Sequence, residues 1–254
     1  MELLTKAEYA YRRLHDDILS GKLPGGSRLV VKDLVEEYEV SSLPIRNAIA
    51  RLEELGLVHT SAHQGAWVSE MNLESYFTFM LLRTDAEALA AKLAATKRED
   101  SLIQELEQIQ RQMEAACDAG DYERYGRMNR KIHTLVCAAS GNQTLVEQIN
   151  ILMNRTSLAV SMFHIISCEA SCREHRDWLN ALRDKDALRS AAIIRYQRCR
   201  ANLDLIYALQ SGSLDLEENQ LLKQAVAAEG GQECLEQFTA IFQEIQANNN
   251  YREF

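Results

Sequence analysis

The hydrophobic residues in the first fifty positions recur at helical spacing. Apolar side chains three and four residues apart predict helices over about residues 5–20, 31–39 and 42–52. The third predicted helix is the clearest, because its apolar and polar residues lie on opposite faces. Its apolar face carries Ile45, Ala48, Ile49 and Leu52, and the residues away from it are Arg46, Asn47, Ala50 and Arg51. Such a helix is usually a solvated surface helix, so its neighbours decide how it is interpreted.

The segments around these helices are short and rich in turn and strand formers. Residues 21–26 contain proline and three glycines and predict a turn, while residues 28–31 predict a short strand. Two β-rich stretches, residues 56–60 and 66–69, predict a hairpin that bends at Gly65. Helix, strand, helix, turn, helix and hairpin is the order of a winged helix-turn-helix, whose third helix enters the major groove of DNA.

From residue 73 onward, one long helical pattern follows another, with short polar links between them. The predicted helices cover residues 73–96, 99–119, 121–139, 143–166, 168–183 and 187–210. Short links between helices of this length imply antiparallel neighbours in a bundle. The fold class is therefore mainly α, with a winged helix-turn-helix over residues 1–70 and an antiparallel all-α helical bundle over residues 73–210.

Residues 211–254 predict an extra helical hairpin, with helices at about 214–229 and 232–246. The second of these helices has an apolar stripe that must cover a surface, either the chain's own bundle or a second subunit. We expect the hairpin to add to a dimer contact and residues 248–250 to be frayed.

Composition limits the compartment and the partners. The chain is 46% apolar, which suffices for a core, but no apolar run is long enough to span a membrane, so no membrane partner is expected. The N-terminus lacks the pattern of a secretion signal, which indicates a cytoplasmic protein. The six cysteines form no tight CxxC pair, and we expect them to be reduced, buried, small apolar residues. They are Cys117, Cys137, Cys168, Cys172, Cys199 and Cys234.

The charge distribution restricts how DNA can be bound. The formal net charge is −9, and residues 1–70 hold 8 Lys and Arg against 11 Asp and Glu, a net of −3. A chain that binds nucleic acid indiscriminately would need a broad basic surface. Any contact with DNA must therefore come from a local cluster of basic residues.

Three motifs with defined spacing run through residues 5–70. They read Gly21-Lys22-Leu23-Pro24-Gly25, then Val40-Ser41-x-x-Pro44-Ile45-Arg46-x-Ala48-x-x-Arg51-Leu52-x-x-x-Gly56-Leu57-Val58, then Gly65-Ala66-x-Val68. In these motifs the region resembles the DNA-binding domain of GntR-family bacterial transcription regulators. The resemblance implies base and phosphate contacts from two arginines, phosphate contacts from the hydroxyls at the helix start, and a wing contact near the last glycine. The predicted DNA-binding residues are Ser41, Ser42, Pro44, Arg46, Asn47, Arg51 and Gly65.

Two residues depart from the pattern of that family. Members commonly have Arg at the position of Ser42 and Glu at the position of Asn47. The loss of an arginine there removes a potential bidentate guanine contact, which is worth about 1–3 kcal/mol of base discrimination. We therefore expect the operator to differ from the one that is common in the family.

Four polar residues fall on inward faces of the predicted bundle. Asn129 and His133 lie one helical turn apart among apolar residues. His175 and Gln197 lie on either side of the turn at residues 183–186, so a helical hairpin brings them to the same height and facing one another. Each alone is usually a satisfied core residue, but together they favour a polar pocket.

This part of the chain resembles the helical, FCD-type effector domain of the FadR-like branch of the same family. The matching residues are Arg83-x-x-x-Glu87, Asn129-x-x-x-His133, Ser140-Gly141-Asn142, Glu174-His175 and Asp186. Members that bind a metal carry Asp at the position of Asn129 and His at the positions of His133, His175 and Gln197. Here two of the four are amides, which bring no charge and are weaker ligands for zinc or nickel than imidazole.

We therefore expect a metal-free pocket in which these four residues hydrogen-bond a small polar effector. If that effector is a carboxylate or sugar acid, Arg83 can pair with it; the alternative is an internal ion pair with Glu87, four residues away. A divalent zinc or nickel ion held by Asn129, His133 and His175 remains an alternative cofactor.

His164, Cys168, Cys172 and His175 follow nearly one helical stripe. One straight helix cannot wrap four ligands around a tetrahedral zinc ion, so this stripe does not predict a zinc site. Thiol sensing remains an alternative if one thiolate is exposed and activated.

The sequence thus predicts a ligand-responsive homodimer that binds a palindromic double-stranded DNA operator, most simply as a repressor. One rival is a metal-dependent enzyme built on the bundle, but no carboxylate pair, nucleophile–base pair or phosphate loop lies near His133 and His175. The other rival is a winged helix that binds protein and no longer binds DNA, which the acidic charge of residues 1–70 permits.

Overall fold

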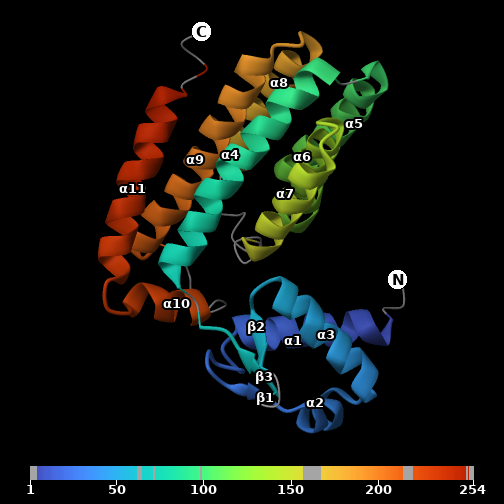
Figure 1. Cartoon of the computed structure of the whole chain (residues 1–254), viewed down its shortest axis with the longest axis vertical. Helices are drawn as coiled ribbons and strands as arrows, with labels where there is room; N and C mark the ends of the chain where they lie inside the picture. The colour runs from blue at the N-terminus through green and yellow to red at the C-terminus, as the bar shows by residue number, and fades with distance from the viewer. Residues whose placement is uncertain are drawn as a thin grey trace. The chain divides into compact units, whose positions relative to one another are not determined.

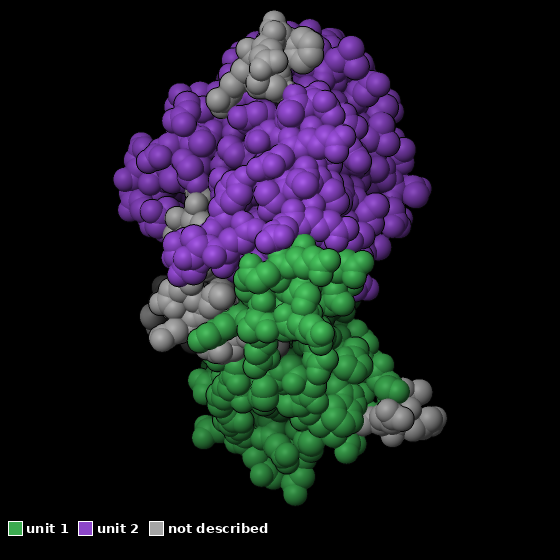
Figure 2. Space-filling model, turned by 90° about the vertical axis from the view of Figure 1, so that its left-hand side faces the viewer, with its two compact units in different colours: residues 1–76, 214–234 green, residues 77–213, 235–254 purple. Residues whose placement is uncertain are grey.

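The chain forms two compact units (Figures 1 and 2). A computed structural model describes residues 5–61, 65–70, 72–97, 99–156, 167–213, 220–249 and 251. The first unit contains residues 1–76 and 214–234, and the second contains residues 77–213 and 235–254. The C-terminal segment, expected as a separate hairpin, is thus divided between the two units. No helix in the described ranges is long and apolar enough to cross a membrane.

The first unit is a small helical domain with a three-stranded antiparallel sheet. Its elements are α1 (Lys6–Leu19), β1 (Arg28–Leu29), α2 (Val31–Tyr38), α3 (Ser42–Glu54), β2 (Val58–Ser61), β3 (Gly65–Val68) and α10 (Gln220–Ala227). The strand order is β1-β3-β2, and β2 pairs with β3 in a hairpin that sets Ser61 opposite Gly65. The strand expected over residues 28–31 is shorter, because α2 already begins at Val31.

The division of α3 into two faces is confirmed. Its apolar residues are 7% exposed or less: Ile45, Ala48, Ile49 and Leu52. Its polar face is exposed, and the apolar face packs against α1 and α2. The core of the unit therefore fixes α3 from behind and leaves one side of it open. Residues 62–64, within the predicted hairpin, lie outside the described residues.

The second unit is a bundle of long helices. It contains most of α4 (Leu73–Lys97) and α11 (Gly231–Asn248), together with α5 (Asp100–Asp118), α6 (Tyr122–Ala139), α7 (Gln143–Arg155), α8 (Cys168–Arg183) and α9 (Ala187–Ser211). Helix α5 packs against α6 and α8, and α8 packs against α9, around a core that includes Trp178 and Ile132. Short links and antiparallel neighbours confirm the bundle predicted from the sequence.

Two predicted helices are shorter than expected within the described residues. The helix expected over 143–166 ends at Arg155, where the hydroxyl of Thr156 donates to the carbonyl of Leu152 at 2.8 Å. Residues 157–166, which include His164, lie outside the description, as do residues 214–219 at the start of the helix expected over 214–229.

The apolar stripe of α11 covers the chain's own bundle. Leu235, Phe238 and Phe242 are at most 4% exposed, and both phenylalanine rings lie against Phe77, with ring centroids 5.3 and 6.3 Å away. The end of the chain is also held, because Tyr251 is buried. Its hydroxyl donates to Asp177 Oδ2 at 2.8 Å, and its ring stacks edge-on against that of Tyr196.

The expectation of a frayed end is therefore wrong for Asn249. Its side-chain amide donates to the carbonyl of Ile245 at 2.7 Å. Tyr251, two residues further on, anchors this end of the chain, although an Asn-rich run alone suggested disorder. Asn250 lies outside the described residues.

The expectation that all cysteines are reduced is also wrong. Cys117 and Cys168 form a disulfide, although 51 residues separate them in the sequence. The fold brings the end of α5 beside the start of α8, and cysteine spacing alone cannot show such proximity. Cys137, Cys172 and Cys199 are buried free thiols, as expected for small core residues, and burial raises their pKa values.

Candidate functional site

The polar face of α3 borders a groove of about 600 Å³ shared with β1 and the hairpin. Residues from all three elements line it, among them Arg28, Arg46, Glu53, Thr60 and Gly65. No ion pair involves Arg46 within the described residues, and its side chain is exposed. The groove therefore combines an unpaired guanidinium on a helix with a strand hairpin beside it.

The start of α3 presents two serines and a proline. Ser41 occupies the N-cap position with extended backbone angles, but its hydroxyl accepts no hydrogen bond from the first turn. Pro44 lies in that first turn, where the backbone N–H is not needed. Ser42 and Asn47 are exposed, so both departures from the family pattern lie on the accessible face.

The second predicted arginine, Arg51, is held within the unit. Its Nη1 donates to Glu8 Oε2 at 2.9 Å, and its guanidinium carbon lies 3.6 Å from the ring centroid of Tyr11. Hydrogen bonds from Arg51 and then Arg12 lower the pKa of Glu8. Arg51 therefore ties α3 to α1, whereas Arg46 has no such bond to hold it. The spacing of the two arginines in the sequence places both on the polar face of α3. It could not show that Arg51 is bound within the unit and Arg46 is not.

In the second unit, the bundle brings three of the four predicted pocket residues into contact. His133 Nε2 lies 3.2 Å from His175 Nε2, and Gln197 Nε2 lies 3.0 Å from His175 Nδ1. Asn129 is buried as well, at 8% exposed, but no hydrogen bond within the described residues joins it to the other three. The predicted inward faces of α6, α8 and α9 thus meet at the two histidines.

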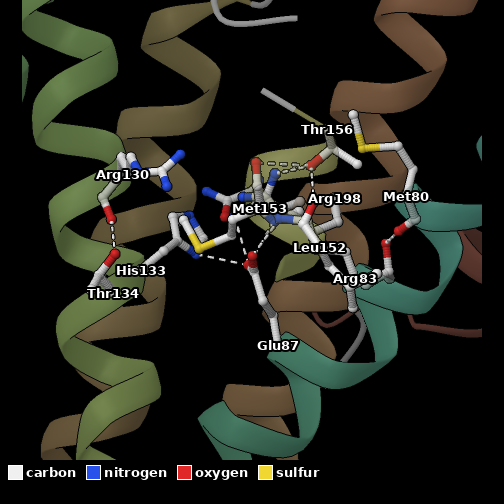
Figure 3. Close-up of polar contacts among 12 residues, drawn as sticks. Met80, Arg83, Glu87, Arg130, His133, Thr134, Leu152, Met153, Thr156 and Arg198 are labelled. Atoms are coloured by element: carbon white, nitrogen blue, oxygen red, sulfur yellow. Dashed lines mark hydrogen bonds and ion pairs between the residues drawn. The ribbon is translucent and has the colours of Figure 1, made fainter. Parts of the chain in front are cut away.

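The centre of this region is the carboxylate of Glu87, which is 2% exposed (Figure 3). Arg83 Nε donates to Oε1 at 2.6 Å, and Arg198 lies against Oε2, with Nη2 at 2.6 Å and Nε at 2.8 Å. His133 Nδ1 lies 3.1 Å from the same Oε2. A further bond joins Arg83 Nη1 to Thr156 Oγ1 at 2.9 Å. We call Glu87, Arg83, Arg198 and His133 the Glu87 cluster.

Electrostatics fixes the charge of each member of the Glu87 cluster. Burial by itself raises the pKa of Glu87, but Arg198, Arg83 and His133 outweigh burial and hold that pKa well below its usual range. Burial, assisted by Arg198, lowers the pKa of His133 to about 4, and burial and His133 lower that of His175. At neutral pH, both imidazoles are neutral, and two guanidinium groups face one carboxylate. The Glu87 cluster therefore carries one buried positive charge in excess.

The ring nitrogens of the two histidines face oxygen acceptors on one side and each other on the other side. The carbonyl of Ser171 lies 2.7 Å from His175 Nδ1, and Glu87 Oε2 faces His133 Nδ1; both oxygens can only accept. If each neutral ring gives its single hydrogen to that oxygen, the two Nε2 atoms face each other with lone pairs only. The donor nearest to these two nitrogens is the side-chain amide of Gln197, whose Nε2 lies 3.4 Å from His175 Nε2.

Sequence reasoning missed the buried arginines of α9. Arg198 belongs to the Glu87 cluster, and Arg200 donates to both carboxylate oxygens of the fully buried Glu174, at 2.6 and 2.9 Å. Arg200 also pairs with Asp204, whose side chain is 32% exposed and so is screened by water. The signal was present as arginines among the apolar residues of α9.

The sequence left open whether Arg83 pairs with Glu87 or with an effector carboxylate. This question is partly answered, because the ion pair with Glu87 is formed.

The donor set does not fit a divalent metal ion. No group of three or more His, Cys, Asp or Glu side chains that could hold a metal occurs within the described ranges. Two neutral imidazoles and two amides would have to bind a dication beside an excess buried positive charge. The alternative of a zinc or nickel ion at Asn129, His133 and His175 therefore has no support in the charges around it.

A winged helix followed by a helical bundle is the architecture of a bacterial transcription regulator, and comparison with known families supports this. Residues 6–68 match the profile described as bacterial regulatory proteins, gntR family. Residues 79–197 match the profile of the FCD domain. The chain therefore belongs to the GntR family and carries an FCD domain.

Relatives of known name are transcription regulators and not enzymes. The repressor RspR of Escherichia coli (strain K12) is 26% identical over 186 residues, which are 71% of this chain and 81% of RspR. A probable D-xylose utilization operon transcriptional repressor of Paenarthrobacter nicotinovorans is 24% identical over 174 residues, 67% of this chain and 75% of that protein. The solved structure of E. coli McbR/YncC shares the fold, with a TM-score of 0.63 at 21% identity over 82% of this chain and 100% of that chain.

The low pKa of His133 predicts that the bundle loses stability in mild acid. The folded state lowers this pKa from 6.5 to about 4, so stability is complete above pH 6.5 and falls as the pH drops toward 4. The loss from this residue is on the order of 3 kcal/mol. Urea unfolding can be followed by Trp178 fluorescence in a Trp67→Phe background. His133→Gln should flatten the pH dependence, and His59→Gln on the exposed strand should leave it unchanged. An unaltered slope in His133→Gln would contradict the assignment.

Proposed function

We propose that this GntR-family regulator is a homodimeric repressor that binds a palindromic operator and responds to a small hydroxy carboxylate. The observation that carries the effector class is the excess positive charge of the Glu87 cluster. Two largely buried guanidinium groups, on side chains 12% and 14% exposed, share one carboxylate there. A buried charge without a partner is costly, so a second carboxylate supplied by a ligand would be stabilised at this place.

The histidine pair supports a hydroxyl group on the same ligand. The Nε2 atoms of His133 and His175 lie 3.2 Å apart, and the amide nitrogen of Gln197 lies 3.4 Å from His175 Nε2, which leaves His133 Nε2 as an acceptor for a ligand hydroxyl. An alcohol can donate to one of these nitrogens, whereas a second cation would add to the excess charge. His133 Nδ1 thus adjoins the Glu87 carboxylate, and His133 Nε2 adjoins the place proposed for a hydroxyl. Sugar acids carry both groups.

Helix α4 offers a route by which an effector can influence DNA binding. It carries Arg83 and Glu87, and it follows β3 of the winged unit after residues 69–72. An effector that favours one arrangement of the two α4 helices in a dimer would favour one spacing of the DNA-binding units. Because a two-fold dimer reads two half-sites in inverted orientation, we expect a palindromic operator. The named repressors among the relatives support repression as the mode of action.

The recognition role of α3 can be tested by replacing its unpaired arginine. Arg46→Ala should weaken binding to an operator selected from random DNA by about 5- to 150-fold, because it removes a base contact. Fluorescence anisotropy at several salt concentrations measures this, and specific binding should weaken steeply with salt. Arg173→Ala, an exposed arginine of α8, is the matched control and should bind like the unaltered chain. Equal affinity of Arg46→Ala for the operator would refute the assignment.

The effector class can be tested with matched compounds that lack either the hydroxyl or the carboxylate. Lactate and gluconate should raise the Tm of the full chain, while propionate and neutral glucose should raise it less, with or without a metal chelator. Arg198→Gln should weaken gluconate binding at least 10-fold, because it removes the excess positive charge. Arg195→Gln, on the same helix but paired with surface Asp85, is the control and should not weaken it. Stabilisation that needs a divalent metal, or that survives Arg198→Gln unchanged, would contradict the proposal.

A further inference from the structure

We propose that Cys117 and Cys168 form a reversible thiol–disulfide site that controls the histidine pair through the first turn of α8. The inference goes beyond the response to an effector and rests on the DNA-binding function only for the compartment. A regulator that binds bacterial DNA works where thiols are kept reduced. Disulfides in that compartment are usually transient and catalytic or redox-sensing, rather than structural.

The disulfide joins two helices that other bonds already hold together. Cys117 lies near the end of α5, and Cys168 is the first residue of α8. Further along, Gln110 Nε2 donates to the carbonyl of Cys172 at 2.9 Å, and Arg176 Nε donates to Glu114 Oε1 at 2.6 Å. Breaking the disulfide therefore leaves the two helices packed and frees only the beginning of α8.

The two sulfurs differ in solvent exposure, which determines the sulfur that a reductant attacks first. Cys168 is 8% exposed, whereas Cys117 is half-buried and can be reached from solvent. The thiolate of a dithiol reductant attacks Cys117 Sγ, the Cys117–Cys168 bond breaks, and Cys168 leaves as a thiolate. The second thiol of the reductant then displaces Cys117 from the mixed disulfide. The reductant leaves as a disulfide, and both cysteines are thiols after protonation.

The start of α8 is a favourable place for the departing thiolate. Cys168 is the first residue of a helix of 16 residues, and Ser167 caps that helix by accepting a hydrogen bond from the N–H of Ala170 at 3.2 Å. Free N–H groups of a first helical turn stabilise a thiolate. Cys172, one turn further on, is buried, and burial raises its pKa to about 12. It therefore stays a neutral thiol and does not react in place of Cys168.

Oxidation restores the bond with a hydroperoxide as the oxidant. The Cys168 thiolate takes one oxygen from the peroxide and becomes a sulfenic acid, while the peroxide leaves as an alcohol or water after protonation. The thiol of Cys117 then attacks Cys168 Sγ, and the oxygen departs as water. The two steps transfer two electrons from the cysteines to the peroxide, and the proposed cycle needs no group other than these two reactants.

The first turn of α8 leads directly to the histidine pair. The N–H of Ser171 donates to the carbonyl of Ser167 at 3.0 Å, and the carbonyl of Ser171 lies 2.7 Å from His175 Nδ1. His175 in turn contacts His133, a member of the Glu87 cluster. Freeing Cys168 loosens the turn that holds the Ser171 carbonyl, and this changes which nitrogen of His175 carries the hydrogen.

The test compares the full chain after treatment with dithiothreitol and after treatment with hydrogen peroxide. Differential alkylation with peptide mapping by mass spectrometry reports each cysteine, and 15N NMR of the histidine rings reports which nitrogen carries hydrogen. We expect peroxide to protect Cys117 and Cys168, dithiothreitol to expose both, and the ring signals of His175 to shift reversibly between the two states. Failure of peroxide to protect this pair would overturn the site. Identical His175 signals in the two states would overturn the control of the histidines.

Matched variants separate this proposal from other effects. Cys168→Ser should give the dithiothreitol-type His175 signals under both treatments, whereas Cys137→Ser and Cys172→Ser should respond like the unaltered chain. A lasting peroxide response of the His175 signals in Cys168→Ser would contradict the proposal. Arg46→Ala, which is expected to weaken operator binding, should leave the alkylation pattern and ring signals unchanged. Failure of the redox site can therefore be distinguished from failure of the proposed DNA recognition.

Discussion

The second unit depends on the burial of one carboxylate. Glu87 is removed from water inside the bundle, which costs several kcal/mol for an isolated ion. Arg83 from its own helix, Arg198 from α9 and His133 from α6 compensate for that loss. Three helices are thus fastened at a single polar point. Removal of Glu87 would leave both guanidinium groups without their carboxylate, and breaking a buried pair in this way typically costs about 3–5 kcal/mol. Because the stability of the Glu87 cluster depends on a single charge, we expect a bound anion to alter it.

Arginines have different surroundings in the two units. In the winged unit, Arg51 is bound by Glu8 and Tyr11 and stabilises the packing of α3 against α1, while Arg46 lines the groove and has no ion pair within the described residues. In the bundle, Arg83 and Arg198 are both bound, but they share one acceptor. The function of an arginine therefore depends on how many acceptors its surroundings offer. In the proposed function, these few guanidinium groups are what lets an acidic chain bind DNA and an anionic effector.

Much of the architecture follows from the sequence, because helical periodicity is a local property. The division of α3 into a buried and an exposed face, and the inward orientation of His133 and His175, could be predicted from residue spacing alone. Contacts between distant segments could not. The Cys117–Cys168 disulfide, the binding of Arg51 by α1 and the placement of Arg198 against Glu87 all depend on which helices become neighbours. The anchoring of Tyr251 on Asp177 is of the same kind, because an Asn-rich run masks a tertiary contact.

In the proposed function, the Glu87 cluster receives the carboxylate of a hydroxy acid. A crystal structure of the full chain with gluconate, determined once with and once without added zinc, tests it most directly. We expect the ligand carboxylate to lie within hydrogen-bond distance of the guanidinium groups of Arg83 and Arg198, and a ligand hydroxyl to contact Nε2 of His133 or His175. A metal ion between those two Nε2 atoms, or gluconate bound away from both arginines, would contradict the account.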